Sequence, residues 1–147
     1  MSIFMALGLL VAFGASRAQA QIVGEIEADI PFQFHAGNAR FPAGKYILKM
    51  LDNSDLDAME IRSADGNHAA IFQVMSAQAE TSPSKTELIF NKYGNQYFLS
   101  KVFDEANKYG SEALESHYEK MVRKNGLKPE KHHVSARHHS HQMTHKK

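Results

Sequence analysis

Three glycine–asparagine pairs lie between stretches of alternating apolar and polar residues, and this pattern restricts the chain to an antiparallel β fold. The pairs begin at Gly37, Gly66 and Gly94. Glycine and asparagine tolerate the positive φ of tight hairpin turns, and alternation with a period of two is typical of strands with one buried face. Their spacing of 29 and 28 residues fits tandem hairpin units, although independent selection for tight turns produces the same spacing. Either origin predicts a mainly β fold of six or more antiparallel strands, as a small sandwich or barrel.

The turns also predict which side chains share a face. A turn through Gly66 places one set of residues on a common side: Met59, Ile61, Ala70, Phe72 and Val74. In the next hairpin, around Gly94, Phe90 is expected opposite Leu99. The same register places Leu88 opposite Lys101. The other face of this hairpin is expected to hold Ile89, Phe98 and Val102.

The N-terminus is typical of an export signal. Residues 3–15 form an apolar run interrupted only by glycine, and Ala18-Gln19-Ala20 follows as the small-x-small pattern of a signal-peptidase site. The run is too short to cross a ~30 Å hydrocarbon core as a helix. We therefore expect residues 1–20 to be a signal peptide, cleavage after Ala20, and a periplasmic or extracellular protein without a stable membrane span. No Lys or Arg precedes the run, so a retained anchor or a buried helix is the alternative.

The mature chain is expected to contain three segments. Residues 21–110 form the antiparallel β domain. Residues 111–126 form a short helix, with Ser111 as N-cap and Asn125-Gly126 as its stop. Residues 127–147 form a His-rich basic tail without hydrophobic periodicity, predicted to be disordered. The chain has no cysteine, which excludes disulfides, thiolate metal sites and a cysteine nucleophile.

Charge divides the mature chain into two parts. Residues 21–119 contain 8 basic and 15 acidic residues, a net charge of −7, whereas residues 120–147 contain 8 basic and 1 acidic, a net charge of +7. A cationic tail favours anionic partners such as an envelope surface or polymer, through contacts that salt should weaken. Nucleic acid is not an expected partner, because an exported protein seldom meets it and no aromatic residues are interleaved with the basic ones of the tail.

Six histidines make the tail a candidate metal-binding segment. They are His132, His133, His138, His139, His141 and His145. Neutral imidazole nitrogens bind Zn²⁺, Ni²⁺ or Cu²⁺, and a flexible chain imposes no unsuitable geometry. A disordered tail also offers no outer shell to orient the ligands, so a solvated basic tail is the alternative. Mild acidity would protonate these histidines and strengthen the tail as a polycation.

Catalytic motifs are largely missing. Residues 82–85 read S-x-x-K, without the companion motifs of penicillin-recognising enzymes, and G-x-S-x-G, H-E-x-x-H and phosphate-binding glycine loops do not occur. The sequence therefore favours a non-enzymatic envelope-binding or scaffolding domain with a cationic tail. Metal binding by that tail is one alternative. A small apolar ligand carried inside a barrel is another, because phenylalanines are numerous.

Several phrases resemble a family of uncharacterised small exported all-β proteins of acidobacterial-type bacteria. They are Ile30-Pro31-Phe32-Gln33-Phe34, Phe41-Pro42-Ala43-Gly44-Lys45-Tyr46, Ile61-Arg62-Ser63-Ala64-Asp65-Gly66 and Tyr93-Gly94-Asn95-Gln96-Tyr97-Phe98-Leu99. The resemblance spans residues 25–119 and consists mainly of turns and core strands. It implies the β fold and export, and it assigns no functional residue. The His-rich tail departs from the family pattern.

Overall fold

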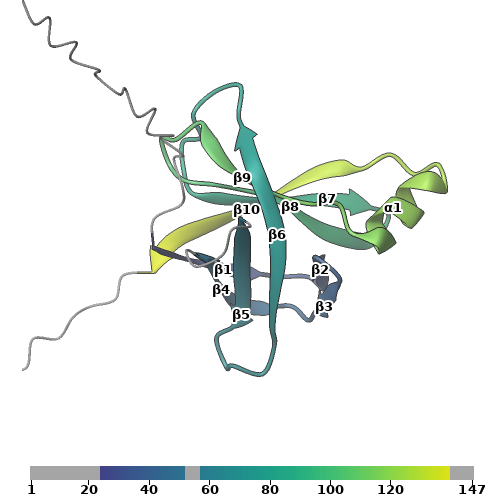
Figure 1. Cartoon of the computed structure of the whole chain (residues 1–147), viewed down its shortest axis with the longest axis horizontal. Helices are drawn as coiled ribbons and strands as arrows, with labels where there is room; N and C mark the ends of the chain where they lie inside the picture. Colours follow the sequence, from purple (N-terminus) through teal and green to yellow (C-terminus); the bar gives the residue numbers. More distant parts are fainter. Residues whose placement is uncertain (1–23, 52–56, 140–147) are drawn as a thin grey trace, which may run out of the picture.

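The computed structural model describes residues 24–51 and 57–139, with the side chain of His139 left out. The predicted signal peptide, residues 1–20, and the end of the predicted tail, residues 140–147, lie outside the described residues. The described chain forms ten strands and one helix (Figure 1). They are β1 Glu25–Ile30, β2 Phe34–Ala36, β3 Ala39–Phe41, β4 Gly44–Leu51, β5 Ala58–Ser63, β6 Ala69–Gln78, β7 Glu87–Tyr93, β8 Gln96–Phe103, β9 Tyr109–Ala113, α1 His117–Lys124 and β10 Glu130–His139.

Eight of these strands close into an antiparallel barrel. The order around it is β10-β1-β4-β5-β6-β9-β8-β7, and β7 pairs with β10 to complete the circle. Eight strands enclose an interior just wide enough for side chains to fill. Of the two predicted architectures, the barrel is therefore the one observed. The short β2–β3 hairpin is additional, and β2 joins β8 in parallel through His35 and Phe98.

Apolar side chains fill the barrel as one contiguous cluster. Its fully buried large members include Phe34, Phe90, Leu48 and Leu88. The predicted common face of β5 and β6 is confirmed, because Met59 lies opposite Phe72, Ile61 lies opposite Ala70, and all five residues of that face belong to the cluster or pack against it. The prediction of an apolar ligand inside the barrel is not tested by this packing and stays a prediction.

The β7–β8 hairpin matches the predicted register only near its turn. Phe90 lies opposite Leu99, as expected. Beyond this pair the register shifts, because Ser100 is an extra residue without a partner on β7, as in a β-bulge. Leu88 consequently lies opposite Val102. The expected Leu88–Lys101 pair and the placement of Val102 on the other face are wrong, and both apolar side chains enter the core.

The helix is shorter than predicted. Its N-cap is Ser116, whose Oγ accepts a hydrogen bond from the Glu119 amide at 3.1 Å. The expected N-cap, Ser111, instead lies in β9, where it pairs with strands on both sides. Two ladders stabilise this residue more than one turn of a marginal helix would. The predicted stop is correct: Asn125 is the C-cap and Gly126 follows with φ +89°.

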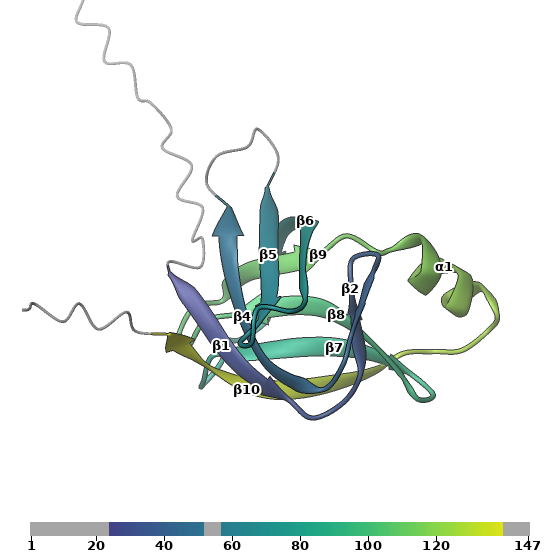
Figure 2. The ribbon, with the colours of Figure 1, turned by 90° about the horizontal axis from the view of Figure 1, so that it is seen from below.

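Residues 130–139 are not a disordered tail. They form β10, which lies between β1 and β7 and closes the barrel. The prediction failed here because β10 is polar, with Val134 as its only buried residue among 130–138, so hydrophobic periodicity could not reveal it. Figure 2 shows this strand crossing the underside of the barrel beside β1 and β7. None of the described residues belongs to a helix with the length and hydropathy of a membrane span.

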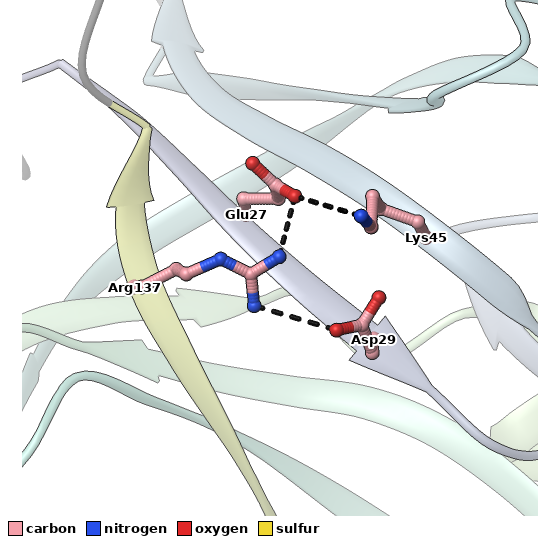
Figure 3. A network of polar contacts seen from close by, with 4 residues as sticks. All are labelled: Glu27, Asp29, Lys45 and Arg137. Carbon is pink, nitrogen blue, oxygen red and sulfur yellow. Dashed lines mark hydrogen bonds and ion pairs between the residues drawn. The ribbon is translucent and has the colours of Figure 1, made fainter.

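Ion pairs hold the polar strand β10 to the acidic strand β1. The Arg137 guanidinium donates to Glu27 Oε1 and to Asp29 Oδ2, and Glu27 also pairs with Lys45 of β4 at 3.4 Å (Figure 3). The hydrogen bond that Arg137 donates to Glu27 is the main cause of the raised pKa of Arg137. The charge division of the sequence therefore becomes, in part, a set of contacts between neighbouring strands.

Candidate functional site

The structure does not bring the described tail histidines together. On β10, His132 and His133 face opposite sides of the sheet. His138 lies six residues beyond His132, a separation of about 20 Å at ~3.3 Å per residue. No group of three or more potential metal ligands occurs among residues 24–51 and 57–138. The side chains of His139, His141 and His145 lie outside the described part, so metal binding by the tail stays a prediction.

Each described tail histidine has a local partner instead. His132 lies edge-on to the rings of Phe32 and Tyr97, at centroid distances of 5.2 and 5.5 Å. His133 Nδ1 lies 3.1 Å from a carboxylate oxygen of Glu87. His138 Nε2 lies 2.8 Å from Asp104 Oδ1. These contacts attach β10 to the barrel.

Among the described residues, a surface cleft of about 490 Å³ has mainly polar walls. We call it the hairpin cleft, since the β2–β3 hairpin forms one wall, the β7–β8 turn forms another, and α1 contributes Tyr118. Figures 1 and 2 show the hairpin and α1 on the same side of the barrel. The lining residues are Gln33, His35, Gly37, Asn38, Arg40, Asn95, Gln96, Tyr97 and Tyr118.

Two of the glycine–asparagine pairs of the sequence build this cleft. Gly37 and Gly94 have φ of +58° and +60°, and each is the first central residue of a two-residue hairpin turn, where positive φ favours glycine. The asparagines that follow them, Asn38 and Asn95, both line the cleft. Gly37 also packs against β6, because a Cβ there would lie 2.9 Å from the Cβ of Phe72.

His35 forms part of the wall as a neutral, stacked ring. Its imidazole stacks on Phe98 with a centroid distance of 4.7 Å and an interplanar angle of 16°. Tyr118 approaches the same imidazole at 5.2 Å. Burial lowers the pKa of His35 below its usual value, and the nearby Arg40 charge lowers that pKa further. His35 is therefore uncharged at neutral pH.

Arg40 supplies the positive charge of the hairpin cleft. Its Nη2 donates to Gln33 Oε1 at 3.0 Å, and no carboxylate of the described chain lies within ion-pair distance of it. None of the residues that line the cleft is acidic. The remaining guanidinium donors are thus accessible to an anion from outside, since the residue is exposed.

The opposite wall offers amides and an aromatic ring. Tyr97 stacks on Phe32 at 3.8 Å, and the Lys92 ammonium lies 5.5 Å above the Tyr97 ring. The side-chain oxygen of Gln96 is buried and has no hydrogen-bond partner among the described residues. Buried acceptors of this kind are rare, and each one lowers stability until a donor reaches it.

A buried carboxylate fixes α1, and with it Tyr118, at the edge of the cleft. Glu119 accepts hydrogen bonds from Asn91 Nδ2 at 2.9 Å and from the Tyr93 hydroxyl at 3.3 Å. Burial raises the pKa of Glu119. Burial, followed by the charge and hydrogen bond of Glu119, raises the pKa of Tyr93 to about 12. Val122 belongs to the same small apolar cluster as Tyr93 and Phe98.

A scan against protein-family models and searches of the curated proteins and of the solved structures each return no match for this chain. Function therefore has to be argued from the cleft itself. Sequence reasoning did not identify the cleft, although it located the two turns that form it.

Proposed function

We propose that this protein is a non-enzymatic exported binding domain of the cell envelope, and that its ligand is a polar, negatively charged envelope component held in the hairpin cleft. One observation carries the proposal: Arg40 lies in a cleft without acidic residues and has no carboxylate partner among the described residues. Cationic clefts attract anions and raise their local concentration. The volume of about 490 Å³ lies in the usual range of small-ligand sites.

The same residues favour binding over catalysis. His35 is the only candidate base among the lining residues, and no carboxylate orients it. Its ring is instead held against Phe98 and Tyr118. General acid–base and nucleophilic sites require paired groups within hydrogen-bond reach, whereas this cleft offers one imidazole and one guanidinium among amides and phenols.

The envelope location rests on the sequence, namely the apolar run of residues 3–15 and the Ala18-Gln19-Ala20 pattern. The proposed tethering by the tail now depends on fewer charges. Arg137 is paired with Glu27 and Asp29 in the barrel wall, so its charge is partly neutralised. We propose that residues 140–147 still help to bind anionic surfaces. This segment contains His141, His145 and the last two lysines.

The experiment compares envelope binding by cleft and control variants of the mature protein. Arg40→Gln and Tyr118→Ala change the cleft. The control Arg62→Gln removes an arginine of β5 that lies outside the cleft and pairs with Glu25 of β1. Thermal melting checks that each variant is folded. We expect Arg40→Gln to lose at least about tenfold in affinity for isolated envelope polymers, because a charge-assisted hydrogen bond contributes ~1.5–3 kcal/mol. Tyr118→Ala should also bind more weakly than wild type, because it removes ring contact, and the control should bind as wild type does. Equal binding by cleft variants and wild type would contradict the proposal.

A further inference from the structure

We infer that the hairpin cleft recognises an acidic saccharide, that is, a polymer or oligomer of sugars carrying carboxylates. This inference rests on the proposed function and specifies its ligand class. Three properties of the cleft carry it: one guanidinium without a carboxylate partner among the described residues, a majority of amide and phenol groups, and aromatic rings at its edge.

The guanidinium suits an oxyanion such as a carboxylate. Arg40 uses Nη2 for Gln33, and a guanidinium carries five N–H donors in a fixed fork that matches the two oxygens of a carboxylate. The donors that remain after the Gln33 contact can therefore hold a carboxylate group of the ligand.

The amides favour a ligand rich in hydroxyls. Asn38, Asn95 and Gln96 line the cleft together with Gln33, and each amide both donates and accepts hydrogen bonds. A sugar hydroxyl does the same.

The rings supply apolar contact for the sugar face. Tyr118 is 45% exposed although it lies 5.2 Å from the His35 ring, so part of its surface is available to a ligand. Tyrosine combines an apolar ring with a hydrogen-bonding hydroxyl, which suits a ligand whose surface is also mixed. An apolar ligand would leave the surrounding amides without partners, and a simple anion would leave the rings unused.

Isothermal titration calorimetry with a trimer of galacturonic acid and with its methyl ester tests this inference. The ester keeps the sugar and removes the negative charge. We expect the acid to bind wild type at least about tenfold more tightly than the ester. Arg40→Gln should abolish that preference, Arg40→Lys should restore only part of it because an ammonium lacks the fork, and Arg62→Gln should retain it.

Two results would overturn the inference, and they are distinguishable. If envelope polymers bind through the cleft but the acid trimer does not, or if acid and ester bind alike, the ligand class is wrong and the proposed function stands. If the cleft variants bind every polymer as wild type does, the proposed function fails together with the inference.

Discussion

Deleting residues 130–147 should unfold the barrel, whereas deleting residues 140–147 should leave it folded. The first deletion removes β10, which pairs with β1 on one side and with β7 on the other. It leaves two unpaired strand edges in place of a closed wall, and such edges promote aggregation. The second deletion removes only residues that follow β10.

The expected loss of unfolding free energy follows from the residue pairs that β10 forms with its two neighbouring strands. β10 has four partner pairs with β1 and six with β7. If each pair contributes about one backbone hydrogen bond with a net ~0.5–1.5 kcal/mol, their loss costs roughly 5–15 kcal/mol. Burial of Val134 adds about 1.5–3 kcal/mol. The total equals or exceeds the ~5–15 kcal/mol stability of a typical domain.

Far-UV circular dichroism and urea unfolding of the two truncated proteins provide the assay, with the full mature chain as reference. The protein ending at residue 139 should show a cooperative transition within about 1 kcal/mol of the reference. The protein ending at residue 129 should show no cooperative transition. Adding a synthetic peptide of residues 130–139 to this shorter protein should restore β structure. A cooperative, near-native transition for the protein ending at residue 129 would refute the assignment of β10 to the barrel wall.

Three further predictions concern the core, the helix and the cleft. Gly110→Ala should destabilise the barrel by about 3 kcal/mol in urea unfolding, because the added Cβ would overlap the Val102 carbonyl oxygen. In the control Gly44→Ala, the added Cβ makes only an ordinary contact and should change stability by less than about 1 kcal/mol. Equal losses of stability in the two variants would count against this packing. The folded-state pKa of Glu119 is raised by burial, so wild type should lose stability as pH rises from ~4.3 through that pKa. Glu119→Gln should remove this loss and be at least as stable as wild type at pH 7, and a less stable variant would contradict the argument. The pKa of His35 is lowered by burial and by Arg40, and it should rise when a carboxylate of the galacturonate trimer binds in the cleft. NMR of the imidazole protons follows this pKa. An unchanged pKa would place the carboxylate elsewhere.

Local chemistry made part of this fold predictable. The hairpin turns at Gly66 and Gly94 follow from glycines at positions of positive φ, and the face shared by Met59 and Ile61 follows from period-two alternation. The bulge at Ser100 could not be predicted, because an extra residue leaves no mark in an apolar pattern.

The remaining features depend on long-range contacts. β10 has the composition of a solvated tail, and it becomes a strand because β1 and β7 offer free edges and because acidic side chains such as Glu27 pair with Arg137. The cleft depends on the pairing of β2 with β8, which brings Arg40 of one hairpin near Gln96 of another. The sequence separation of residues 40 and 96 does not indicate that they lie close together. The glycines of the neighbouring turns indicate only where the chain reverses.

Amide chemical-shift mapping by NMR can show whether the hairpin cleft is the ligand site. The ¹⁵N-labelled mature protein would be titrated with the galacturonate trimer. We expect shift changes centred on His35, Arg40, Gln96 and Tyr118, with residues 140–147 little affected. Shift changes confined to residues 140–147, or none within the cleft, would contradict it.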